Sequence, residues 1–261
     1  MSRGAGRRAA AATSALAAIV LLAAAGCGSA GPAPARCAAR APGETSSILD
    51  LEQTQNAATI AAVGKRLGLA DHAVSVALAA ALQESKLRNL DYGDRDSLGI
   101  FQQRPSQGWG PPERILVPRL AAAAFFTRLR SIPGWQTLPV ADAAQAVQHS
   151  ASAAAYEQWD TEARLLARTL TGEVTAGLSC SGLPRSAALQ EAPLTTAASD
   201  EMGAGRLHSS AAGQVWASAT WLVAHADAFG VSAVTAAGQR WTRESGRWQP
   251  DAAAGPGVTY A

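Results

Sequence analysis

At residues 72–110 the chain reads HAVSVALAAALQESKLRNLDYGDRDSLGIFQQRPSQGWG. The first part of this stretch predicts a helix in which Ser75 is the only polar residue between Ala73 and Leu82. A helix that is apolar on every side is buried in the centre of a domain. The second part is a polar loop that is rich in turn-forming residues. Glu84 stands at the boundary between the buried helix and the polar loop.

This position predicts that Glu84 is an acid with a raised pKa, because burial disfavours the charged carboxylate. A carboxyl group of this kind can give its proton to a leaving-group oxygen near neutral pH, and cleavage of a glycosidic bond requires such a donor. The alternative is a helix-terminal glutamate that is exposed to water or paired with Lys86 or Arg88.

Two motifs follow Glu84-Ser85 along the chain, namely Gly99-Ile100-Phe101-Gln102 and Arg104-Pro105-Ser106. The pattern resembles that of the soluble lytic transglycosylases, in which a catalytic Glu-Ser precedes a Gly-Leu-Met-Gln motif at the same spacing. Leu98 to Gln102 also looks like a loop of animal-type lysozymes. The resemblance implies a mainly α fold with an α+β lysozyme-like domain, in which Glu84 is the general acid.

We expect six further residues to contact the saccharide: Ser85, Gly99, Gln102, Gln103, Trp109 and Gln148. The resemblance implies that Ser85 holds the acid or the substrate, that Gly99 lets the backbone approach the sugar, and that Gln102 hydrogen-bonds it. The alternatives are local hydrogen bonds for Ser85 and Gln102, an ordinary turn for Gly99, and core packing for Trp109.

A third motif departs from the family pattern. Those transglycosylases carry an Ala-Tyr-Asn-like motif whose tyrosine positions the acid, whereas the best match here is Ala146-Val147-Gln148, without a tyrosine. Tyr156 is near in sequence but out of register. The missing tyrosine favours one alternative, a non-catalytic glycan-binding or scaffold lipoprotein.

The reaction type depends on a second carboxylate. An inverting muramidase would use Asp91, Asp94 or Asp96 to activate water, but DYGDRD is as readily a solvated turn. With Glu84 alone, the substrate completes the displacement and leaves a 1,6-anhydromuramyl end. We therefore expect a lytic transglycosylase that cleaves the β-1,4 bond between N-acetylmuramic acid and N-acetylglucosamine, and the muramidase remains an alternative.

Residues 1–27 have the pattern of a lipoprotein signal peptide, with three arginines before an apolar run. Residues 24–27, AAGC, resemble the lipobox, in which the cysteine is lipidated. This predicts a lipid anchor at Cys27 that holds the exported chain on the membrane, facing the cell wall; a spanning helix or simple secretion are the alternatives. Cys37 and Cys180 then form a disulfide in an oxidising compartment, or are two unrelated buried thiols.

The charge balance argues against nucleic acid as a partner. The chain has 22 basic and 20 acidic residues, and removal of residues 1–26 takes away three arginines, which leaves 19 basic residues against 20 acidic ones. No basic stripe remains to follow a phosphate backbone.

The four histidines form no ligand-spaced cluster. We expect peptidoglycan glycan strands as the ligand, with no metal and no cofactor. The sequence does not identify which protein partners, if any, the chain has.

Periodicity predicts one helical domain at residues 46–180, between a Pro- and Ala-rich spacer at 28–45 and a linker at 181–200. Its expected helices cover residues 46–69, 72–85 with Asp71 as N-cap, 112–132, 140–150 and 152–170. Residues 201–252 predict a small C-terminal element of one helix and two strands. This element looks like the closing part of modules on actinobacterial wall proteins related to zinc-dependent peptidoglycan peptidases, without their metal-binding segments.

Overall fold

The computed structural model describes Met1 and residues 34–149, 154–184, 188–208 and 210–261. The predicted signal peptide, the lipid attachment at Cys27 and the first part of the spacer lie outside the described residues. The described residues between 34 and 261 form one compact unit. In the described part of the chain, no helix is long and apolar enough to cross a membrane.

The unit is mainly helical and contains two small antiparallel sheets, which fits the mainly α or α+β class expected from the sequence. The described α-helices are α1 (Leu51–Arg66), α2 (Asp71–Ser85), α3 (Pro112–Ile115), α4 (Pro118–Arg130), α5 (Val140–Gln148), α6 (Ala154–Glu157), α7 (Asp160–Leu170), α8 (Glu191–Met202), α9 (Ala212–Ala224) and α10 (Ala226–Phe229). The described strands are β1 (Arg36–Ala39), β2 (Ser47–Leu49), β3 (Leu178–Ser181), β4 (Ala233–Ala236), β5 (Gln239–Thr242), β6 (Trp248–Pro250) and β7 (Val258–Tyr260).

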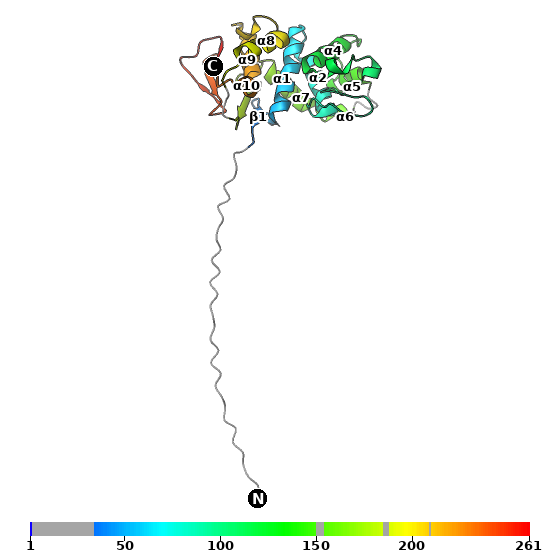
Figure 1. The fold of residues 1–261 in the computed structure, drawn as a ribbon, viewed down its shortest axis with the longest axis horizontal. Coiled ribbons are helices and arrows are strands. Elements are labelled where there is room, and N and C mark those ends of the chain that lie inside the picture. Colours follow the sequence, from blue (N-terminus) through cyan, green and yellow to red (C-terminus); the bar gives the residue numbers. More distant parts are fainter. Residues whose placement is uncertain (2–33, 150–153, 185–187, 209) are drawn as a thin grey trace. The chain divides into compact units, whose positions relative to one another are not determined.

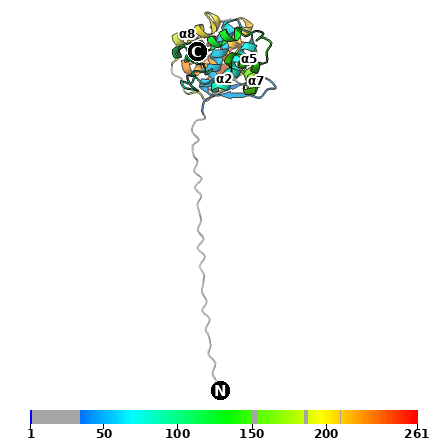
Figure 2. The same ribbon diagram turned by 90° about the vertical axis from the view of Figure 1, so that its right-hand side faces the viewer.

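Helix α2 is the buried centre that its sequence predicts. Every residue from Ala73 to Leu82 is buried, and α5 and α7 pack against the helix (Figure 2). The N-cap is Ala70, and Asp71 is the first helical residue. Helix α1 lies between two groups of helices, since it contacts α2 and α4 as well as α8 and α9 (Figure 1). Helix α1 therefore connects the half that carries Glu84 with the C-terminal half.

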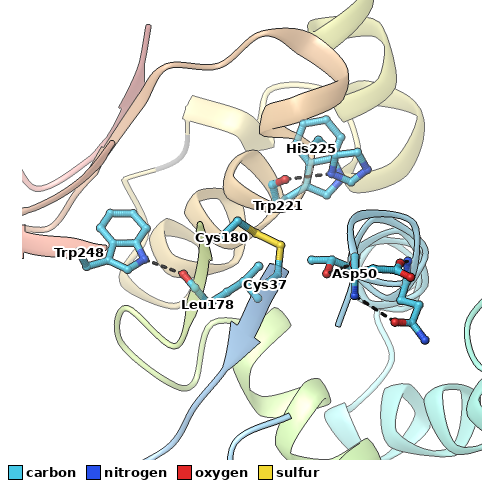
Figure 3. The surroundings of a disulfide bond; sticks show 9 residues. Cys37, Asp50, Leu178, Cys180, Trp221, His225 and Trp248 are labelled. Carbon is cyan, nitrogen blue, oxygen red and sulfur yellow. Dashed lines mark hydrogen bonds between the residues drawn. A yellow bond between two sulfur atoms is a disulfide. The ribbon is translucent and has the colours of Figure 1, made fainter. Parts of the chain in front are cut away.

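The start of α1 differs from the predicted residue 46, because Ser47–Leu49 pair with β1 as strand β2. Asp50 then caps the helix. Its side chain accepts a hydrogen bond from the Gln53 N–H at 3.0 Å, and the Gln53 side chain accepts one from the Asp50 N–H at 3.0 Å (Figure 3). Such a capping box satisfies two donors that the first turn of a helix leaves open.

The helix predicted over 112–132 is divided into α3 and α4 by a proline. Pro118 has no N–H to donate and keeps Val117 extended, with φ of −100° and ψ of 106°. The helix predicted over 152–170 is likewise two elements, α6 and α7, in its described part.

A disulfide joins the two ends of the helical region, as the sequence predicts. Cys37 on β1 and Cys180 on β3 face each other in the sheet of order β2-β1-β3 and are bonded (Figure 3). The spacer predicted at 28–45 is wrong for Arg36–Ala39, because three of these four strand residues are buried. The disulfide fits an oxidising, extracytoplasmic compartment.

The C-terminal part is larger than the predicted element of one helix and two strands. Helix α8 begins inside the linker predicted at 181–200, where Leu194 and Ala198, one turn apart, are both buried. The second sheet has four strands in the order β6-β5-β4-β7, and β7 lies beyond the predicted end at residue 252.

The C-terminal sheet docks on β3. The Trp248 Nε1–H donates to the Leu178 carbonyl at 2.7 Å (Figure 3). Gly246 approaches the same strand so closely that a Cβ atom on it would lie 2.5 Å from Cβ of Ser181. The second sheet is therefore part of the compact unit.

Candidate active site

Glu84 lies on the last turn of α2, just before a sharp reversal of the chain. Lys86 and Leu87 both have left-handed backbone angles, with φ of 56° and 62°. Two amides of α1 hold this reversal: Gln53 Nε2 donates to the Lys86 carbonyl at 2.9 Å, and Asn56 Nδ2 donates to the Leu87 carbonyl at 2.7 Å. Helix α1 thus fixes the end of α2, and with it the position of Glu84.

The Glu84 carboxyl group is half-buried and is held by two side chains. The Tyr156 O–H donates to Oε1 at 2.7 Å, and the Gln148 side chain also hydrogen-bonds the carboxyl group. Burial raises the pKa of Glu84 above its ordinary value, and it outweighs the hydrogen bonds from Tyr156 and Gln148 and the charge of Lys86, which lower the pKa. The direction agrees with the prediction from the apolar helix.

The two cations considered as alternative partners of Glu84 have other contacts. Arg88 forms ion pairs with two acidic residues around the start of α1, at 2.5 and 2.9 Å. The Lys86 ammonium group lies 4.1 Å from the centre of the Trp159 ring. The carboxyl group of Glu84 is therefore bound by the uncharged donors of Tyr156 and Gln148.

Tyr156 supplies the hydroxyl group that the third sequence motif lacks. In the sequence, Tyr156 is out of register with the family motif. Helices α5 and α6 both pack on α2, however, and this packing brings Tyr156 to the same carboxyl group as Gln148. Gln148 also donates to the Phe101 carbonyl at 2.8 Å, which ties it to the Gly99 to Gln102 motif. The near-complete burial of Tyr156, at 1% exposure, is what distinguishes it from an ordinary surface tyrosine.

Ser85 and Gly99 have structural contacts, which differ from the substrate contacts predicted for them. Ser85 is buried; its hydroxyl donates to the Ile100 carbonyl at 2.8 Å and accepts from the Arg88 N–H at 3.1 Å. Gly99 has a φ of +76°, and a Cβ atom there would lie 2.8 Å from the Ile115 carbonyl oxygen. Glycine is needed at this position for its backbone angle and for the approach to Ile115.

Gln102 of the motif and its neighbour Gln103 line different cavities. Gln102 lines the same cleft as Glu84, and its Nε2 lies 3.2 Å from the carbonyl oxygens of Tyr92 and Gly99. Gln103 is 1% exposed and donates to the Ala121 carbonyl at 3.2 Å. It lines a neighbouring cavity of about 190 Å³ and is not among the residues that line the cleft around Glu84.

Glu84 opens into a polar cleft of about 520 Å³. The cleft is also lined by Gln102, Gln148, Trp109 and three arginines, Arg95, Arg104 and Arg128. Trp109 lines the cleft, but the Arg128 guanidinium carbon lies 3.8 Å from the centre of its ring. One face of Trp109 is therefore covered, which leaves at most the other face for a sugar. Sequence reasoning missed Arg128, because α4 is distant along the chain from the motifs around Glu84.

Glu84 is the one acid among the described residues that line the cleft. In the loop considered as the source of a second acid, Asp96 binds Arg104 Nε at 2.7 Å and a backbone N–H at 2.8 Å. These contacts hold the pKa of Asp96 well below its usual range. Asp91 and Asp94 are exposed. The loop thus has the character of a solvated turn.

Comparisons with known proteins assign no family to the chain, because no family model matches it and no curated protein does. The geometry around Glu84 is therefore what bears on function. Within the described ranges, no group of three or more His, Cys, Asp or Glu side chains is arranged to hold a metal ion.

Proposed function

We propose that the chain is an exported lytic transglycosylase of the lysozyme-like type, which cleaves the β-1,4 bond between N-acetylmuramic acid and N-acetylglucosamine in peptidoglycan. One observation carries the proposal: the half-buried Glu84 carboxyl group receives the Tyr156 O–H at 2.7 Å in a polar cleft where it is the one acid among the described lining residues. The lytic route requires a single acid that gives up a proton and later takes one back.

In this reaction Glu84 first donates its proton to the glycosidic oxygen. The bond between that oxygen and C1 of N-acetylmuramic acid breaks, and N-acetylglucosamine leaves with a hydroxyl group. The Glu84 carboxylate then takes the proton of the C6 hydroxyl of the same muramic acid, and the C6 oxygen bonds to C1. No water is consumed, and Glu84 is protonated again. Between the two transfers, hydrogen bonds from Tyr156 and Gln148 stabilise the carboxylate.

Two observations support the lytic route over the alternatives. A non-catalytic binding protein was suggested by the missing tyrosine, and Tyr156 now supplies a hydroxyl group to the acid. An inverting muramidase needs a second carboxyl group about 6.5–9.5 Å from the acid across the cleft. The described lining of the cleft offers none besides Glu84.

The proposal includes attachment of lipid at Cys27, which would hold the enzyme on the outer face of the membrane beside its substrate. The disulfide between Cys37 and Cys180 supports an exported protein. The partners in this proposal are the glycan strands and the membrane.

Digestion of purified peptidoglycan tests the proposed reaction. We expect the full-length wild type to release fragments with 1,6-anhydromuramyl ends, which mass spectrometry identifies. Glu84→Gln should lower the rate at least about a hundredfold, because an amide cannot donate the proton. The matched control is Glu157→Gln, which removes an exposed acid next to Tyr156 and should leave the rate unchanged. Reducing ends would instead indicate hydrolysis, and an absence of products from the wild type would contradict any glycan-cleaving activity.

A further inference from the structure

Arg128 contributes a positive charge to the wall of the cleft, and its position is fixed by protein contacts. Its guanidinium carbon lies 3.8 Å from the centre of the Trp109 ring, and its Nη2 donates to the Gln107 carbonyl at 3.4 Å. A guanidinium group that is already ordered loses little freedom when it binds a ligand. Its planar shape and its several N–H donors suit a carboxylate.

The two other arginines of the cleft differ from Arg128 in their acidic neighbours. Arg104 is neutralised by Asp96, with 2.7 Å between Nε and Oδ1. Arg95 lies 3.9 Å from Asp94, and the two side chains are 71% and 89% exposed. Arg128 forms no ion pair with any described acid, although it lines the same cleft as Glu84. An unpaired, ordered cation in the same cleft as the acid fits a ligand that itself carries negative charge.

We propose that Arg128 binds a carboxylate of the glycan substrate and so makes the cleft selective for anionic strands. The inference rests on the proposed function, because the strand supplies the ligand. N-acetylmuramic acid carries a lactyl group, whose carboxyl is either free or linked to a peptide stem that itself bears carboxylates. Both sources present the same chemistry to a guanidinium group. Since the exported chain is close to neutral, the positive charge at this wall is a local feature of the cleft.

Binding measurements in a Glu84→Gln background test this inference without turnover. The full-length chain is titrated with three preparations of soluble strands: strands with intact peptide stems, strands from which an amidase has removed the stems, and strands whose carboxyl groups have been converted to amides. We expect the additional change Arg128→Gln to raise Kd about three- to tenfold on strands that carry carboxylates. The amidated strands should bind equally well with and without Arg128.

The controls separate the role of Arg128 from a loss of charge or of folding. Arg247→Gln removes an exposed arginine that does not line the cleft, so it should leave every Kd unchanged. Arg128→Lys keeps the charge without the planar group and should weaken binding less than Arg128→Gln. A loss on stripped strands alone identifies the lactyl carboxylate, and a loss on intact strands alone identifies the stem.

Two outcomes would overturn the inference and leave the proposed function intact: an unchanged Kd in Arg128→Gln on all strands, or an equal loss on amidated strands. If the Glu84→Gln chain binds none of the strands, the proposed function itself is wrong.

Discussion

The pKa of Glu84 depends on two opposing effects that come from different parts of the chain. Burial at the end of α2 raises it, while the side chains of Tyr156 on α6 and Gln148 on α5 lower it. The protonated form serves the first step of the proposed reaction and the carboxylate serves the second. Tyr156 therefore adjusts the balance between the two forms in addition to orienting the group.

Tyr156→Phe should move the alkaline limit of activity to higher pH. The general acid must start protonated, so activity falls as pH rises through the pKa of Glu84. The Tyr156 O–H favours the carboxylate, and without it the pKa rises further. The maximal rate should fall about ten- to a hundredfold, because the carboxyl group is less well oriented. The measurement is the rate of muropeptide release over a series of pH values.

Tyr92→Phe is the matched control, since it makes the same chemical change on a side chain that is 68% exposed. It should keep the wild-type pH profile. A Tyr156→Phe profile whose alkaline limb stays in place or moves to lower pH would show that the hydroxyl group does not act on Glu84.

The acid could be predicted from its neighbours in sequence, and its tyrosine could not. The burial of Glu84 follows from an apolar helix that is continuous in the chain. The contact with Tyr156 depends on how α6 packs on α2, and a motif with fixed spacing cannot contain that information. The same reason explains why the sequence does not identify Arg128, on α4, as a residue of the cleft.

The turn after α2, at Lys86 and Leu87, is the element that fixes the position of Glu84. Gln53 and Asn56, one turn apart on α1, bind the carbonyls of Lys86 and Leu87. Gln53 also completes the capping box at the start of α1 with its side-chain oxygen. One helix thus determines where the next one ends.

Asn56→Ala should destabilise the protein by about 1–3 kcal/mol, because the buried Leu87 carbonyl loses its donor. Activity per folded molecule should fall as well, since this turn fixes the end of α2, where Glu84 lies. Denaturant unfolding and muropeptide release measure the two effects. Thr196→Ala is the control: it removes an exposed side-chain hydrogen bond on α8, and it should change stability by no more than about 0.5 kcal/mol. A stable Asn56→Ala protein would contradict this role of α1.

For the motif residues Ser85 and Gly99, the sequence pattern predicts the positions but not the contacts within the protein. Their positions were predicted, but their partners are the backbone of Ile100 and of Ile115. Each fixes the loop that carries Gln102 into the cleft. Because each partner is a backbone carbonyl group, no residue type in the sequence identifies it, and the family pattern assigns the two residues to the substrate instead.

At the scale of the whole molecule, amino-acid composition did not predict correctly where the folded part begins or where its helices and strands lie. The segments expected as spacer and linker are rich in alanine and proline, yet they contain β1 and part of α8. Small side chains pack closely in a core as readily as they form loops. On α8, Glu201 accepts hydrogen bonds from Thr59 of α1 at 3.0 Å and from Trp221 of α9 at 2.8 Å. Such contacts join the C-terminal part to the half that carries Glu84.

A pair of glycine variants tests whether the C-terminal sheet folds as part of the unit. Gly246 and Gly238 both have positive φ, of +62° and +78°, but only Gly246 is crowded: a Cβ atom there would lie 2.5 Å from Cβ of Ser181, whereas nothing lies within 4 Å at Gly238. Gly238→Ala should therefore cost about 1–2 kcal/mol for the backbone angle alone. Gly246→Ala should cost about 1–3 kcal/mol more, because the sheet is forced away from β3. Denaturant unfolding should show a single transition for both variants, since the sheet and the helices share one core. An early separate transition in Gly246→Ala, with the rest of the protein unchanged, would instead show that the C-terminal sheet is an independent domain.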